Sequence, residues 1–251
     1  MLGPSDMKGK AALVTGASGD LGKAVALRLA ASGADICLVD PDSSAMEACA
    51  GKVEALGVRV HVHASDLKGA ASCRAVIDAA VEILGRLDAL CNVANVFAPA
   101  HAGEMAEADW EATLAINLSA PFYLFQAGLP HLLQASGAVV SVGSCGAFMA
   151  SPFTAAYTAS KAALVQMTKV LAKEFIDQPI RINCVAPGSM SIASGNAAKI
   201  PDNVDMAQVQ KLSRDLITVD DVAALVAFLA SDAAVGFHGA CLTMDNGLSL
   251  G

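Results

Sequence analysis

The sequence predicts an α/β fold of three layers, in which a parallel β-sheet of about seven strands carries helices on both faces. Short runs of β-branched and other apolar residues alternate with alanine-rich stretches of helical pattern. Runs such as 11–14 and 139–142 are almost continuously apolar, which is typical of strands buried on both faces. No linker, repeat or low-complexity segment divides the chain, so we expect a single domain over residues 1–251.

The expected elements follow the chain in alternation. Strands are expected at 11–15, 34–39, 58–63, 87–92, 137–143, 180–186 and 240–244. Helices are expected at 20–31, 42–56, 67–84, 104–134, 154–176 and 219–231. Two segments fall outside this alternation. We expect residues 1–7 to be a disordered leader and residues 189–213 to form a lid over the crevice where an open α/β sheet binds ligands.

The composition excludes several classes of protein. Hydrophobic residues make up 55% of the chain and charged residues 16%, which excludes a disordered chain. The net charge of −8 disfavours nucleic acids as partners. Every apolar stretch is too short to span a membrane, and no signal peptide opens the chain, so we expect no membrane partner. Seven scattered cysteines without a C-x-x-C motif indicate a reduced, cytoplasmic protein. His61 and His63 lack a third ligand in the sequence, so we expect no metal.

A glycine-rich turn follows the first expected strand directly. The segment 15–22 reads TGASGDLG and opens a helix, where backbone N–H groups can bind a pyrophosphate. Asp40 ends the second strand, and a carboxylate there accepts hydrogen bonds from a ribose 2′-hydroxyl and repels a 2′-phosphate. No Lys or Arg lies in the turn or just after Asp40, so the sequence predicts NAD in preference to NADP. Asp66, after the third strand, is expected to meet the adenine amino group, and capping of the next helix is a structural alternative that is compatible with this role.

A tyrosine and a lysine four residues apart mark the other candidate site. Tyr157 and Lys161 project from one face of an expected helix, and Ser144 precedes them at the end of an apolar run. A lysine ammonium close to a phenol lowers the phenol's pKa toward the range of a general acid and base. A serine hydroxyl beside it holds a carbonyl or alcohol oxygen in line with that proton.

With these motifs placed, the chain resembles the short-chain dehydrogenase/reductase family, in the single-domain branch with a Rossmann-like fold. The resemblance runs from about Lys8 to Gly247. It comprises the glycine-rich turn, Asp66, the NVAN segment at 92–95, Asn117, Ser144, Tyr157 with Lys161, the NCVAPG segment at 183–188 and the DNG segment at 245–247.

The resemblance implies an NAD(H)-dependent oxidoreductase that interconverts a secondary alcohol and a ketone by hydride transfer on a small-molecule substrate. It implies that Tyr157 transfers the proton, that Lys161 lowers the pKa of Tyr157 and holds the nicotinamide ribose, and that Ser144 orients the substrate oxygen. Asn117 would support a water that relays protons. The cofactor contacts that it implies fall on Gly16, Ser18, Asp20, Leu21, Gly22, Asp40, Asp66, Leu67, Asn92, Ala94, Tyr157, Lys161, Pro187 and Gly188.

The sequence departs from the family pattern in ways that bear on the cofactor. Asp20 replaces the middle glycine of the usual turn, and we expect its carboxylate to face outward. Ile192 stands where a threonine is common. Two other functions stay open: a 3-oxoacyl thioester reductase of the acyl-carrier-protein type, and an NAD(H)-binding regulator without turnover.

The segment 112–160 contains no Asp, Glu, Lys or Arg. A helix that is uncharged all round must be buried on most sides, and the sheet covers only one of them. The segment therefore predicts contact with another subunit, the alternative being a large intramolecular core. In the family the helices that correspond to 104–134 and 154–176 build dimers or tetramers, so we expect a homo-oligomer.

Overall fold

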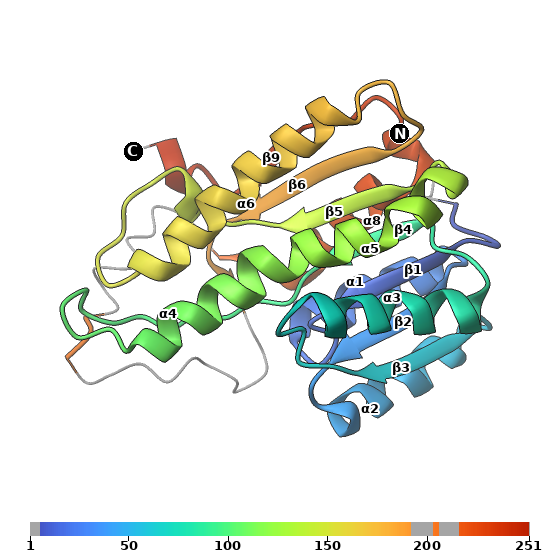
Figure 1. The fold of residues 1–251 in the computed structure, drawn as a ribbon, viewed down its shortest axis with the longest axis horizontal. Helices are drawn as coiled ribbons and strands as arrows, with labels where there is room; N and C mark the ends of the chain where they lie inside the picture. Colours follow the sequence, from blue (N-terminus) through green and yellow to red (C-terminus); the bar gives the residue numbers. More distant parts are fainter. Residues whose placement is uncertain (1–5, 192–202, 206–215, 251) are drawn as a thin grey trace.

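The computed structural model describes residues 6–191, 203–205 and 216–250, and its centre is a seven-stranded sheet (Figure 1). The strands lie in the order β3-β2-β1-β4-β5-β6-β9, and each neighbouring pair is parallel. Their bounds are Ala11–Thr15 for β1, Asp35–Asp40 for β2, Val60–Ala64 for β3, Ala89–Asn92 for β4, Ala138–Val142 for β5, Arg181–Pro187 for β6 and Cys241–Met244 for β9. The predicted fold class is therefore confirmed.

Helices cover both faces of this sheet, and Figure 1 shows α3, α5 and α6 running across its near side. These helices are α3 (Ala70–Leu84), α5 (Ala120–Ala135) and α6 (Ala155–Glu174), and their buried side chains share one core with Leu13 and Leu90 of the sheet. The other core joins Val14 and Ile36 to α1 (Asp20–Ala31), α2 (Ser43–Glu54) and α8 (Val219–Ala230). No described helix has the length and hydropathy needed to cross a membrane.

The strand order places a switch point between β1 and β4. The chain builds β1, β2 and β3 outward in one direction and then returns to place β4 on the other side of β1. The carboxyl ends of β1 and β4 therefore diverge toward helices on opposite faces, which opens a crevice between them.

The expected helix at 104–134 is interrupted. It consists of α4 (Glu107–Leu114), a π-helical turn at Ala115–Ser119 and then α5. Sequence periodicity did not indicate the turn, because one inserted residue leaves the apolar pattern almost unchanged.

Three further differences from the prediction concern the start of α3, the leader and the expected lid. Helix α3 begins at Ala70 and not at 67, because Leu67 and Gly69 have φ values of 55° and 141°. The leader prediction is wrong at its end: Met7 is fully buried and its N–H donates to the Ser32 carbonyl oxygen, while residues 1–5 lie outside the described residues. Within the expected lid, Met190–Ser191 (β7) pairs with Ile217–Thr218 (β8), and most of the rest lies outside the described residues.

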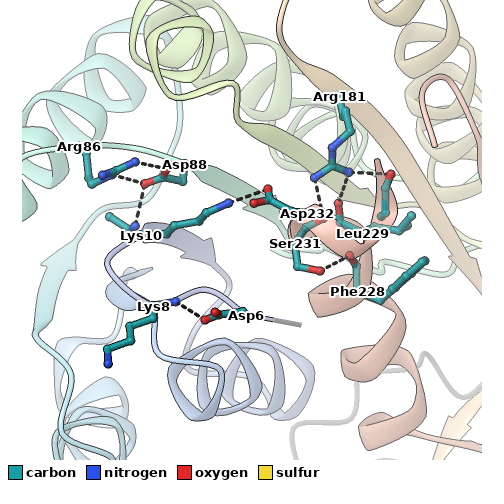
Figure 2. Close-up of polar contacts among 12 residues, drawn as sticks. Asp6, Lys8, Lys10, Arg86, Asp88, Arg181, Phe228, Leu229, Ser231 and Asp232 are labelled. Atoms are coloured by element: carbon teal, nitrogen blue, oxygen red, sulfur yellow. Dashed lines mark hydrogen bonds and ion pairs between the residues drawn. The ribbon is translucent and has the colours of Figure 1, made fainter. Parts of the chain in front are cut away.

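Buried and half-buried ionic groups fix the amino ends of the central strands (Figure 2). The Asp88 carboxylate, 3% exposed, binds the Arg86 guanidinium at 2.6 and 2.7 Å and also accepts from the Ala11 N–H at 2.9 Å. Asp88 therefore joins the start of β4 to the start of β1. At the start of β6, Arg181 donates to the carbonyl oxygens of Leu229 and Ser231, which ties β6 to the end of α8.

Candidate active site

A cavity of about 460 Å³ opens at the carboxyl ends of the parallel strands, at the switch point between β1 and β4. Most of the predicted site residues line it. These are Gly16, Ser18, Asp20, Leu21, Gly22, Asp40, Asp66, Leu67, Ala94, Ser144, Tyr157, Lys161, Pro187 and Gly188. The predicted nucleotide residues and the Tyr157 group thus belong to one cavity, although β1 and α6 are far apart in the sequence.

The glycine-rich turn is packed so closely that two of its glycines cannot carry a side chain. A Cβ on Gly16, whose φ is 69°, would lie 2.8 Å from the Ala94 Cα, and a Cβ on Gly22 would lie 2.1 Å from the Gly16 carbonyl oxygen. A Cβ on Gly19 would make an ordinary contact at 3.4 Å. The turn therefore needs Gly16 and Gly22, and it tolerates a side chain at the position between them.

Asp20 occupies the first residue of α1, in the place of the usual middle glycine. Asp20 is half-buried and contributes to the cavity wall, so the outward direction of its carboxylate stays a prediction. Asp20 is absent from the residues of positive φ, so the backbone there does not require glycine. The helix N-terminus stabilises an acidic side chain at this position.

The carboxylate of Asp40 is held by two backbone N–H groups. Ser18 donates to one oxygen at 3.3 Å and Asp42 to the other at 3.2 Å. These bonds join the end of β2 to the glycine-rich turn and fix the carboxylate at the cavity wall. Asp66 is exposed and accepts from the Lys68 N–H, and the residue that precedes α3 is Gly69, so Asp66 does not cap that helix.

Thr15 and Asn92 have structural roles next to the cavity. The Thr15 hydroxyl oxygen accepts from the N–H groups of Val93 and Ala94, both at 3.0 Å, so it joins the ends of β1 and β4. The position of Thr15 directly before Gly16 is the sequence signal from which this role could have been predicted. Asn92 was predicted to bind cofactor but is not among the lining residues, and its amide donates to the Ser141 hydroxyl of β5 at 3.2 Å.

Lys161 is buried at the floor of the cavity. Its side chain is 1% exposed, and its ammonium donates to the Val142 carbonyl oxygen at 2.8 Å. The ammonium lies 5.7 Å from the centre of the Tyr157 ring. Burial lowers the pKa of Lys161 to about 8, because water no longer solvates the charge.

Tyr157 lies beside Ser144, as predicted, but the direction of its pKa shift is opposite to the prediction. Burial raises the pKa of Tyr157, and a hydrogen bond with the Ser144 hydroxyl opposes that rise. The physical reason is that Lys161 directs its ammonium to the Val142 carbonyl, while desolvation acts on the whole phenol. The ring of Phe97 meets the Tyr157 ring edge-on, with centroids 4.9 Å apart.

Asn117 lies in the π-helical turn, beneath the cavity wall. It is 1% exposed, its amide oxygen accepts from the Val96 N–H at 2.8 Å, and its amide nitrogen donates to the Val96 carbonyl at 2.9 Å and to the Ser160 hydroxyl at 3.1 Å. A π-turn inside a helix is rare and is frequent at functional sites. Asn117 thus connects the loop after β4 with α6.

Two aromatic rings pack where the loops around the cavity meet. The ring of His101 meets that of Phe153 edge-on at 4.6 Å, and the Ala100 N–H donates to the Phe153 carbonyl. Phe153 has a φ of 66°, which is strained for a bulky side chain.

Among the residues described, no cluster of three or more His, Cys, Asp or Glu could hold a metal ion. Ile192 lies outside the described residues.

Comparison with known proteins identifies the relatives of this chain. A family model described as enoyl-(acyl carrier protein) reductase matches residues 16–249. D-threitol dehydrogenase of Mycolicibacterium smegmatis is 37% identical over 245 residues, which cover 97% of this chain and 94% of that protein. Among solved structures, a short-chain dehydrogenase of Burkholderia cenocepacia in complex with NADP has a TM-score of 0.88 and 34% identity, and covers 98% of this chain and 99% of its own. A short-chain dehydrogenase of Mycobacterium paratuberculosis bound to NAD has a TM-score of 0.86 and 27% identity, with 98% and 100% covered.

The buried ammonium of Lys161 predicts a pH-dependent stability. The unfolded chain holds this proton up to a pKa of 10.5, whereas the folded chain loses it from about 8, so between these values the unfolded state binds more protons. The free energy of unfolding of the wild type should therefore rise relative to that of Lys161→Met, by roughly 2 kcal/mol between about pH 8 and 10. Urea unfolding across that range measures it. Lys173→Met, which removes an exposed lysine of α6, should follow the wild type. If the free energies of unfolding of the wild type and Lys161→Met changed with pH in parallel, the lowered pKa of Lys161 would be contradicted.

Proposed function

Because this chain belongs to the short-chain dehydrogenase/reductase family, we propose that it is an NAD(H)-dependent oxidoreductase that interconverts a secondary alcohol and a ketone. The observation that carries the proposal is a single cavity with the Ser144–Tyr157–Lys161 group at one end and Asp40 at the other. A proton donor and a nucleotide-binding wall thus face the same space.

The residues of this cavity fit a nicotinamide dinucleotide, which would supply the ring that donates or accepts hydride. Gly16 and Gly22 keep the start of α1 free of side chains, so backbone N–H groups are available to a pyrophosphate. Asp40 presents a fixed carboxylate to ribose hydroxyls. We propose NAD in preference to NADP because that carboxylate repels a 2′-phosphate.

The protonation states favour Tyr157 as the acid in ketone reduction. Burial keeps its phenol neutral at ordinary pH, so it can donate a proton to the carbonyl oxygen while the Ser144 hydroxyl holds that oxygen. Lys161, with a pKa of about 8, exchanges protons near neutral pH and can restore the one that Tyr157 gives up. In the oxidation of an alcohol the same transfers run in reverse.

The described wall near Tyr157 is mostly apolar, which favours a substrate with an apolar face. Val96, Ile116 and Met190 line the cavity, and Phe97 packs edge-on against Tyr157. A 3-oxoacyl thioester reductase is the second candidate, because the matching family model is described as a reductase of acyl-carrier-protein substrates. An NAD(H)-binding regulator is the candidate from outside the enzymes.

We also propose a cytoplasmic homo-oligomer, dimer or tetramer, formed through the helices of the segments 104–134 and 154–176. The outward faces of α5 and α6 expose uncharged stripes, and the exposed Lys169 and Lys173 lie at the end of the one on α6. The stripes are Phe122, Gln126 and Pro130 on α5, and Ala159, Ala162, Gln166 and Val170 on α6. Phe122 is 38% exposed and Val170 51% exposed in the single chain, so covering them with a second copy removes apolar surface from water.

Replacement of the proposed proton donor tests the function. A panel of secondary alcohols, polyols, cyclic diols and 3-oxoacyl thioesters, followed by NADH absorbance, should identify a substrate that the wild type turns over. Tyr157→Phe should lower that turnover by about 10²–10⁴-fold, which is the usual contribution of a general acid. The chain has one other tyrosine, and Tyr123→Phe should retain full turnover. Binding of NADH without turnover of any substrate would favour the regulator instead.

Asp40 should determine the choice of dinucleotide. Asp40→Ser removes the carboxylate that repels a 2′-phosphate, so the ratio of kcat/KM for NAD to that for NADP should fall about tenfold or more. Asp42→Ser, at the exposed cap of α2, is the matched control and should leave the ratio unchanged. Equal use of both dinucleotides by the wild type would contradict this assignment.

Charges on the exposed stripes should break the oligomer. Phe122→Glu combined with Val170→Glu buries like charges in the proposed interface, so sedimentation at micromolar concentration should show a smaller species than the wild type. Val235→Glu, at a residue that is 79% exposed and off both stripes, should leave the assembly intact. A monomeric wild type would refute the interface.

A further inference from the structure

Two cysteines stand opposite each other on neighbouring strands, beside the proposed active site. Cys184 of β6 and Cys241 of β9 are register partners in the parallel ladder. Side chains of paired residues leave the same face of a sheet, so the two thiols are neighbours. Cys184 is fully buried, and Cys241, on the edge strand, is half-buried and within reach of solvent.

The two thiols interact and differ in acidity. The Cys184 thiol donates to the Val185 carbonyl oxygen at 3.6 Å, and its interaction with Cys241 lowers the pKa of Cys241 and raises that of Cys184, with burial adding to the rise at Cys184. The Lys169 ammonium of α6 lowers the pKa of Cys241 further, against an opposing effect of its burial. Cys241 is thus the more nucleophilic thiol, and Cys184 is the neighbour that can resolve a bond formed on it.

The other five cysteines provide the contrast. All seven lie in the described part of the chain. Burial raises the pKa of the remaining five, to about 12 for Cys37 and Cys91, which makes them poor nucleophiles. Burial also raises the pKa values of Cys49, Cys73 and Cys145.

The spacing of neighbouring strands allows a bond between the two sulfurs. Neighbouring strands lie about 4.8 Å apart, which falls within the Cα separations of about 4.4–6.8 Å found in disulfides. We propose that Cys184 and Cys241 form a dithiol site that low-molecular-weight disulfides oxidise to an intramolecular disulfide, and that this oxidation lowers turnover.

The chemistry is a two-step thiol–disulfide exchange. The Cys241 thiolate attacks one sulfur of the small disulfide, which forms a mixed disulfide and releases one thiolate. Cys184 then gives up its proton and attacks the Cys241 sulfur, which releases the second small thiolate. Two protein thiols are oxidised by two electrons, and one small disulfide is reduced to two thiols.

Cys184 links this site to the proposed catalytic group. A Cβ on Gly143 would lie 2.9 Å from the Cys184 sulfur, so the thiol packs directly under Gly143. The residues on either side of Gly143 are Val142, whose carbonyl holds Lys161, and Ser144. Formation of the disulfide draws the Cys184 sulfur toward Cys241, so the sulfur no longer supports this backbone. A small misplacement of catalytic groups lowers turnover about tenfold or more. This effect on turnover rests on the proposed function, whereas the disulfide itself does not.

Oxidised glutathione applied to the full-length protein tests the proposal. Intact mass should fall by the two hydrogens lost, with no glutathione adduct, and peptide mapping should join the peptides of Cys184 and Cys241. Turnover should fall about tenfold, and a thiol reductant should restore both mass and activity. Cys241→Ser should show no loss of mass and no inhibition, while Cys49→Ser, at an unpaired buried cysteine of α2, should behave as the wild type.

The outcomes separate the claims. A lasting glutathione adduct on Cys241, a bond between other cysteines, or no reaction overturns the dithiol site. A Cys184–Cys241 bond with unchanged turnover overturns its link to catalysis. Absence of turnover in the reduced protein is a failure of the proposed function alone, because the mass and the peptide map still test the disulfide.

Discussion

The buried ammonium of Lys161 is the constraint on which this end of the fold depends. A charge that is 1% exposed loses most of its hydration, and the loss is offset only where polar groups are fixed around it. Its partner is the Val142 carbonyl, at the last residue of β5. Strand β5 must therefore end where α6 presents Lys161, which fixes Ser144 and Tyr157 relative to each other.

The pair β1 and β4 is joined at both of its ends by polar side chains. Asp88 binds the Ala11 N–H where the strands begin, and the Thr15 hydroxyl binds the N–H groups after β4 where they end. Between these points the two strands run in parallel register. The close approach of Gly16 to Ala94 at the cavity follows from this double attachment, because neither strand can shift along the other.

Sequence patterns predicted the sheet well, since most of its buried parallel strands leave short, almost continuous apolar runs that alternate with helical stretches. The same patterns predicted that Gly16, Asp40 and Tyr157 belong to one site, because each stands at a strand end or a helix start. All three line the cavity. Three-dimensional contacts decided the rest. The pKa direction of Tyr157 depends on burial and on where Lys161 directs its ammonium, and the Asn92 amide bonds to Ser141, 49 residues away.

The π-helical turn explains how the cavity wall and α6 hold together. The extra residue of the turn places Asn117 where one amide bonds both to Val96 and to the Ser160 hydroxyl. That hydroxyl donates in turn to the Tyr157 carbonyl, and Val96 precedes Phe97, whose ring packs against the Tyr157 ring. Tyr157 is therefore fixed through its backbone and through its ring by the same amide. An uninterrupted helix would present a different side chain at this point and would lose both connections.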